Sequence, residues 1–257
     1  MKIELKDGRR LLSADLSKPL DISIPLSPGG PRAWYMDPMK IEPVMTERFT
    51  GSVKSGGNVN FRNIWFNPHG HGTHTETVGH IDREMVSINQ TLKTFFFLCE
   101  LISIEPEIYT GAERDHIKKG DKVITAKQIR GKIKPGAPQG LVVRTLPNSA
   151  EKLQRDYSNT NPTFFEPEAL QHIREIGVKH FLTDLPSVDR EEDGGQLLAH
   201  RAFWHGNRPD DRECTISEMV FVADHISDGN YLLNLQIAAF ENDASPSKPI
   251  LYQLQEL

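Results

Sequence analysis

Short apolar runs separated by turn residues dominate the pattern of hydrophobic and polar positions along this chain. In these runs apolar residues either crowd together or alternate with polar ones, which is typical of β-strands. The pattern predicts seven strands, at residues 21–26, 95–104, 141–145, 180–185, 219–226, 231–240 and 249–254. Most of the predicted regular structure is therefore sheet.

Helices are fewer in this pattern, and two of them carry clear start signals. Thr125 and Gln128 form a capping box, which predicts a short helix that Gly131 ends. Pro167 suits a first helical position, and Gly177 closes the helix that follows. The apolar positions of that second helix fall on one side, at Leu170, Ile173 and Ile176. Strands and helices together predict a mixed α/β fold.

Length and composition limit the classes of protein to consider. The 257 residues contain no linker-like tract or repeat, so we expect one domain over 1–257. The 30 basic and 35 acidic residues are scattered, which argues against nucleic acid or a membrane surface as partner. Cys99 and Cys214 are too few for a disulfide framework. Without a signal-peptide core or a run approaching ~20 apolar residues, the expected location is the cytoplasm.

Four of the ten histidines lie within residues 69–80, at His69, His71, His74 and His80. Neutral imidazole is the commonest metal-binding side chain. In an extended strand alternate residues share a face, so His74, Glu76 and His80 would point the same way. Two histidines and a carboxylate suit zinc or manganese. The alternative is a histidine-rich surface loop, but such a loop would not need the glycines interspersed here.

The stretch from Gly72 to His80 resembles the signature His-x-Gly-Thr-His-x-Asp-x-Pro-x-His of the cyclase-like metal-dependent hydrolases, which include bacterial kynurenine formamidase and isatin hydrolase. Other blocks that resemble the family follow in its order, at residues 21–26, 34–38, 124–127 with 141–145, 182–189, and 243–246 with 249–251. The resemblance implies the family's swivelling β/β/α fold, a barrel-like set of sheets with helices packed outside.

The same resemblance implies a ligand set for one or two ions of zinc or manganese. Its members would be His74, Glu76 and His80 from the first segment, with His200 and Glu218 from further along the chain. Glu76 would bridge the ions in a two-metal site. His80 and His200 are the predicted catalytic residues, with His80 carrying a proton to the leaving group. His205 is a second candidate for that role, and its alternative interpretation is a solvated loop histidine.

Two positions depart from the family pattern. Gly70 stands where the family has its first histidine, and Glu76 replaces an aspartate. His69 and His71 flank the missing ligand, but their strand parity would point them away from the metal. A bulge at Gly70 or Gly72 could turn one of them back. Otherwise the site has one protein ligand fewer, and water or substrate fills the position.

A bound divalent ion would supply hydroxide near neutral pH and polarise a carbonyl oxygen, which predicts hydrolysis of a small amide, formamide, lactam or lactone. The chain has no Gly-x-Ser-x-Gly elbow for a serine hydrolase. Two alternatives remain. One is a relative that binds a metal or small ligand without turnover. The other is a cupin-type oxygenase or isomerase, in which His69, His71 and Glu76 would bind the metal and His200 would be dispensable.

The substrate is a small molecule whose identity the sequence does not define. The predicted substrate-binding residues are Trp34, Tyr35, Phe66 and Trp204, which could stack on an aromatic ring. Packing in the core or at the rim of the site is the alternative for the same side chains. The resemblance also implies a homo-oligomer, since relatives of this type commonly pair subunits around the pocket.

Overall fold

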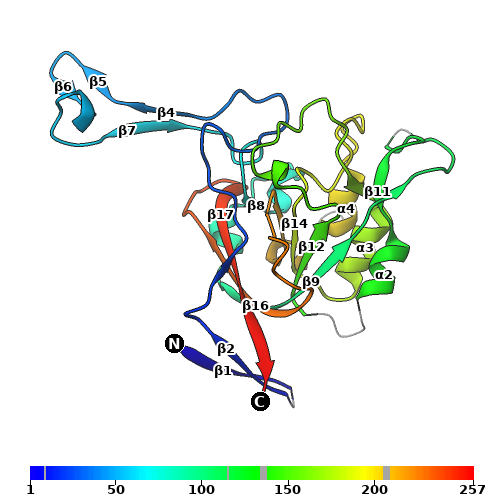
Figure 1. Cartoon of the computed structure of the whole chain (residues 1–257). Coiled ribbons are helices and arrows are strands. Elements are labelled where there is room, and N and C mark those ends of the chain that lie inside the picture. The colour runs from blue at the N-terminus through cyan, green and yellow to red at the C-terminus, as the bar shows by residue number, and fades with distance from the viewer. Residues whose placement is uncertain (9, 115, 134–137, 205–208) are drawn as a thin grey trace.

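The structure is a computed structural model that describes residues 1–257 except 9, 115, 134–137 and 205–208 (Figure 1). Its main sheet closes on itself. The closed path runs β17-β16-β9-β12-β14-β15-β8 and returns to β17 through the pairing of β8 with β17. These strands are β8 (His74–Glu76), β9 (Phe96–Ile104), β12 (Gly140–Thr145), β14 (His180–Thr183), β15 (Thr215–Glu218), β16 (Gly229–Ile237) and β17 (Ala244–Glu256).

Helices cover one side of this barrel (Figure 1). They are α2 (Ala126–Lys132), α3 (Pro167–Glu175) and α4 (Leu198–Trp204), with the single turn α1 (Ile88–Thr91) elsewhere. Short 3-10 turns are η1 (Val53–Ser55), η2 (Val78–His80), η3 (Ala150–Leu153) and η4 (Pro209–Glu213). The predicted mixed fold, barrel-like sheets with helices outside, is confirmed.

The apolar runs form strands that are buried on both faces. In β12, Leu141 and Val143 join the core cluster under the helices, whereas Val142 joins the second cluster on the other face of the sheet. In β14, Phe181 and Leu182 divide in the same way. A strand between two cores can be apolar at every position, which is why these segments read as runs rather than alternations.

The remaining strands are short or peripheral. β1 (Lys2–Asp7) and β2 (Arg10–Asp15) form a hairpin that extends the sheet from the far end of β17, and β3 (Leu20–Asp21) also pairs with β17. A small sheet contains β10 (Glu107–Ile108), β11 (Lys122–Ile124) and β13 (Phe164–Phe165). A long hairpin of β4 (Lys40–Pro43) and β7 (Arg62–Trp65), with β5 (Met45–Thr46) and β6 (Phe49–Thr50) at its tip, projects from the body (Figure 1). We call residues 40–66 the arm.

Most predicted elements are confirmed, and the differences have local causes. The helix from Pro167 is present with Pro167 at its start, and the capping box of Thr125 opens α2. Helix α2 continues through Gly131 to Lys132, so the predicted end at Gly131 was wrong. A strand over 219–226 was also wrong: β15 ends before it, because Met219 turns the chain at a φ of 53°. The strand predicted at 21–26 is reduced to β3 and one isolated bridge.

Candidate metal centre

Glu76, on β8, lies at the centre of a cluster of histidines and carboxylates. This strand lies between β15 and β17, with Glu76 opposite Ile216 on one side and Ala244 on the other. The Glu76 side chain is 1% exposed. Its Oε2 lies 2.9 Å from His69 Nδ1 and 3.9 Å from His80 Nδ1. Its Oε1 lies 3.0 Å from His200 Nε2, so three imidazoles converge on one carboxylate.

His74 and Glu218 face each other across the β8 and β15 pairing. His74 Nε2 lies 3.3 Å from Glu218 Oε2, and Glu218 Oε1 accepts a hydrogen bond from the backbone of Val188. The other nitrogen of His74, Nδ1, lies 3.1 Å from the Gly72 carbonyl, to which it donates. In the neutral ring this leaves the lone pair on Nε2, which is buried and has no hydrogen-bond partner within the described part of the chain. A lone pair left in this state fits a metal ligand.

His200 comes to Glu76 from α4, far along the chain, and Asp189 holds it there. Asp189 Oδ2 lies 2.5 Å from His200 Nδ1. The same carboxylate accepts hydrogen bonds from the backbone N–H groups of Ala199 and His200, where α4 begins. The His200 ring also stacks on Trp204, one helical turn later, at a centroid distance of 5.7 Å. Both contacts fix the ring so that Nε2 points at Glu76.

Of the two histidines that flank Gly70, His69 enters the cluster and His71 does not. Residues 67–70 form a turn, in which the Asn67 side chain accepts hydrogen bonds from the backbone N–H groups of His69 and Gly70. The turn directs His69 toward Glu76. His71 Nε2 instead donates to the Asp37 carbonyl at 2.8 Å, and its Nδ1 accepts from the Asn67 N–H. A bulge was expected to turn one of these histidines toward the metal ligands. The turn at residues 67–70 does this instead, and it does so for His69 only.

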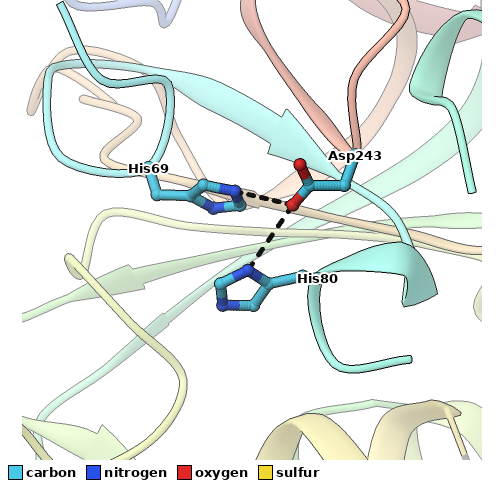
Figure 2. A group of neighbouring side chains, drawn as sticks. All are labelled: His69, His80 and Asp243. Carbon is cyan, nitrogen blue, oxygen red and sulfur yellow. Dashed lines mark hydrogen bonds and ion pairs between the residues drawn. The ribbon is translucent and has the colours of Figure 1, made fainter. Parts of the chain in front are cut away.

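Asp243 is a member of the cluster that the sequence did not identify as a site residue. It lies directly before β17, and its Oδ2 lies 2.8 Å from His69 Nε2 and 3.6 Å from His80 Nδ1 (Figure 2). The rings of His69 and His80 stack at a centroid distance of 4.2 Å. A signal existed, since Asp243 opens a block that resembles the family. Its role depends on β17 pairing with β8, which no local pattern shows.

The electrostatics of the cluster follow from this mutual contact. Burial by itself would lower the pKa of His69, but the hydrogen bonds to Asp243 and Glu76 and their charges raise it to about 10. His200 behaves alike: the contacts with Asp189 and Glu76 outweigh burial and raise its pKa. Burial would raise the pKa of Glu76, but the charge of His80 and the hydrogen bonds to His200 and His69 lower it well below the usual range. The cluster thus pairs carboxylates with positive charge that either protons or a cation can supply.

The donor set fits a divalent cation. Three overlapping groups each bring three ligand atoms within 4.8 Å of one another: His69, His80 and Asp243; His69, His74 and Glu76; and Glu76, His80 and His200. Adjacent ligand atoms on a tetrahedral zinc ion are about 3.3 Å apart, given Zn–N bonds of ~2.0–2.1 Å. The contacts at Glu76 span 2.9–3.9 Å, which brackets that value. Mixed imidazole and carboxylate donors suit zinc, manganese and similar ions.

The predicted substrate-binding residues lie at different depths. Trp34 is half-buried against a cluster of Ala33, Tyr157 and Met219, beside the segment that contains Gly70. Phe66 stacks on Phe240. Phe66 lies three residues before His69, and Phe240 lies three residues before Asp243, so both rings adjoin the cluster in sequence.

The other two predicted substrate contacts are placed less favourably. Tyr35 is 60% exposed. Trp204 is fully buried behind His200, so it supports the ring and cannot itself touch a substrate. His205 lies outside the described residues.

Comparison with known proteins gives a consistent result. A family model described as "Putative cyclase" matches residues 15–190. The kynurenine formamidase of Bacillus cytotoxicus is 26% identical over 241 residues, covering 93% of this chain and 97% of that protein. The kynurenine formamidase of Bacillus cereus is 24% identical over 246 residues, covering 92% and 95%.

Solved structures share the fold over nearly the whole chain. A predicted metal-dependent hydrolase from Bacillus stearothermophilus has a TM-score of 0.61 at 16% identity, covering 91% of this chain and 98% of that chain. Isatin hydrolase A from Labrenzia aggregata, solved with benzyl benzoate, has a TM-score of 0.61 at 16% identity, covering 91% and 93%.

Proposed function

Because this chain belongs to the cyclase family, we propose that it is a metal-dependent hydrolase of a small amide, formamide, lactam or lactone. The observation that carries the proposal is the convergence of His69, His74, His80 and His200 on Glu76 and Glu218 from separate parts of the chain. The similarity to kynurenine formamidase and isatin hydrolase supports an amide or cyclic amide as substrate. Zinc or manganese is the proposed ion, as one or two per chain.

When bound, a divalent ion at this centre would lower the pKa of a coordinated water to about 7 and polarise a carbonyl oxygen. His69, His74, Glu76, His200 and Glu218 are the residues that would hold it. His200 and His74 are almost completely buried, at 3% and 0% side-chain exposure, which suits ligands and leaves neither ring open to a substrate. We therefore place His200 among the ligands, and propose no direct contact between it and the substrate.

His80 is the proposed proton carrier. Its side chain is 29% exposed, the highest value among the four clustered histidines, so it is accessible where His74 and His200 are not. Asp243 lies 3.6 Å from His80 Nδ1 and would orient the ring. An oriented imidazole beside the reacting carbon can pass a proton to the departing nitrogen or oxygen. Trp34 and Phe66 flank the cluster and are proposed to contact the substrate.

The experiment is a hydrolysis assay of zinc- or manganese-loaded protein on an aromatic formamide, a lactam and a lactone. Glu76→Gln should lower kcat/KM by about 100- to 1000-fold, since the loss of one charged ligand costs on the order of 3–4 kcal/mol of transition-state stabilisation. Glu4→Gln, exposed on β1 and outside both the cluster and the arm, is the matched control and should leave kcat/KM unchanged. Loaded wild-type protein that hydrolyses none of these compounds would favour the alternative, a relative that binds without turnover.

The cupin interpretation loses its support. It required His71 as a ligand and made His200 dispensable. His71 is held by Asp37 and Asn67 outside the cluster, whereas His200 contacts Glu76 directly.

We also propose that the protein is a homo-oligomer that assembles through the arm. Of the large apolar side chains exposed in the described residues, those on the arm are Met45, Phe49, Val53, Val59, Phe61, Ile64 and Trp65. The arm stands away from the body, so these side chains have no core of their own chain to cover them (Figure 1). A concentration of exposed large apolar side chains on one projecting segment is typical of a subunit interface.

Among the described residues no helix is long and apolar enough to cross a bilayer. Cys99 and Cys214 are free and buried, which supports the proposed cytoplasmic location.

A further inference from the structure

His69 has a carboxylate at each of its two ring nitrogens. Nδ1 lies 2.9 Å from Glu76 Oε2, and Nε2 lies 2.8 Å from Asp243 Oδ2 (Figure 2). A neutral imidazole carries one N–H, so it can donate to one of these carboxylates only. The other nitrogen would then face a carboxylate oxygen with its lone pair, which is favourable only where a cation lies between them; without a cation, a second proton on the ring takes its place.

A candidate ligand group lies on each side of the ring, with Asp243 and His80 or with Glu76 and His74, and the Glu76 side fits the cation better. His69 Nδ1 shares that side with His74, whose buried Nε2 lacks a hydrogen-bond partner in the described chain, and with Glu76 itself. The Asp243 side has a carboxylate whose Oδ2 also contacts His80 Nδ1. With a cation bound beside Glu76, the N–H of His69 therefore belongs on Nε2, where it donates to Asp243, and the lone pair belongs on Nδ1.

His200 shows the same arrangement on the opposite side of Glu76. Its Nε2 faces Glu76 Oε1 at 3.0 Å, and its Nδ1 faces Asp189 Oδ2 at 2.5 Å. Each histidine thus has Glu76 at one nitrogen and an aspartate at the other. A carboxylate on the far nitrogen of a metal-binding histidine fixes the tautomer and the ring orientation.

The position of His69 on a turn explains why its ring needs a carboxylate such as Asp243 to orient it. A Cβ at Gly70 would lie 2.7 Å from Met36 Cγ, so no side chain fits there without moving Met36. The ring that reaches Glu76 comes instead from position 69, on a turn outside β8. A ligand on a turn is less firmly directed than one on a paired strand, and a second contact is required to orient it.

We propose that Asp243 is a positioning residue that makes His69 a metal ligand: it accepts the Nε2 proton of His69 and so directs the Nδ1 lone pair toward a cation beside Glu76. His69 thereby replaces the histidine that Gly70 lacks. This inference rests on the proposed metal centre. It assigns no contact between Asp243 and the ion, and none between Asp243 and substrate.

The first test measures zinc affinity by competition with a chromophoric chelator. Asp243→Ala should weaken zinc binding about 10- to 100-fold, the usual effect of removing a carboxylate that orients a metal-binding histidine. Asp243→Asn keeps an acceptor oxygen and should recover part of that loss. Asp224→Ala, an exposed aspartate that contacts Asn148, is the control and should bind zinc as the wild type does. Wild-type affinity in Asp243→Ala would overturn the proposal.

The second test reads out zinc-loaded wild-type protein labelled with ¹⁵N, and a variant serves only to assign signals. Long-range ¹H–¹⁵N correlation of the imidazole rings distinguishes protonated from metal-bound nitrogens, and His69→Gln assigns the His69 signals. We expect a protonated Nε2 and a metal-bound Nδ1 on His69. A metal-bound Nε2, or two protonated nitrogens, would overturn the proposal.

These results are separable from the proposed hydrolase activity, since neither measurement uses a substrate. Protein that binds zinc with the expected tautomer but hydrolyses nothing would contradict the proposed function and leave the role of Asp243 intact. Wild-type protein that takes up no zinc would contradict both.

Discussion

Gly79 allows a test of the backbone on which His80 is placed. It is the middle residue of η2, between Glu76 and His80. A Cβ at this position would lie 2.6 Å from the backbone nitrogen of Val86 and 2.8 Å from its carbonyl oxygen. Real Cβ atoms do not approach backbone so closely, and backbone cannot rotate away as a side chain can. Gly79→Ala must therefore displace η2 or the segment at Val86, which the Thr77 hydroxyl ties down by donating to the Val86 carbonyl at 2.6 Å.

The expected cost is that of overpacking, about 1–3 kcal/mol in the free energy of unfolding. With a urea m-value of about 2–3 kcal/mol/M, the unfolding midpoint should fall by roughly 0.3–1.5 M. The displacement also moves His80, so kcat should fall in the loaded enzyme. Urea titration followed by circular dichroism measures the first effect, and the hydrolysis assay measures the second.

Gly131→Ala is the matched control, because it makes the same chemical change where a Cβ meets open space. Gly131 lies within α2, so alanine should raise the free energy of unfolding by up to about 0.5–1 kcal/mol. The two substitutions are thus expected to have opposite signs. A Gly79→Ala protein as stable as the wild type would refute the steric argument. It would also refute the inference that the close packing of Gly79 against the Val86 backbone fixes the position of His80.

Two further predictions concern other parts of the molecule. Burial, and then the charge of Lys179, lower the pKa of His180 from 6.5 to about 4. Below pH 6.5 the unfolded chain therefore takes up a proton that the folded protein does not, so the stability that neutral His180 allows above pH 6.5 falls as the pH drops toward 4. Removing the histidine by His180→Gln should make the unfolding free energy less dependent on pH between 6.5 and 4, by up to about 3 kcal/mol, which denaturant titration at each pH would measure; parallel pH profiles for both proteins would contradict it. In the arm, Phe61→Glu should reduce the molar mass found by light scattering, whereas Met85→Glu, equally exposed on the body, should not; an unchanged mass in both would exclude the arm as the interface.

The elements that the sequence predicted well are those whose signals are local. The runs at 141–145 and 180–185 are apolar because both faces of β12 and β14 are buried, and this identified them as strands. Thr125 and Pro167 mark helix starts by the hydrogen bonds they make or cannot make. The predicted strand over 219–226 is absent because Met219 adopts a left-handed conformation, which ends β15. The apolar composition of this segment gives no sign of that conformation.

The candidate site divides in the same way. The two-residue period of a strand places His74 and Glu76 on one face, and the structure has both on β8. The choice between His69 and His71 depended on a turn closed by Asn67, which strand parity does not describe. The sequence suggested His200 and Glu218 only by resemblance, and their distances to Glu76 and His74 come from the pairing of β8 with β15 and from α4.

The sequence by itself determined which segments are buried on two faces, where two helices begin, and that one strand carries a histidine and a carboxylate side by side. These properties depend on residues a few positions apart, whose geometry the backbone fixes. Only the tertiary structure decided that Asp243 stands behind His69 and that His200 reaches Glu76, because closing the barrel through β8 and β17 and packing α4 beside β8 bring together groups separated by more than a hundred residues.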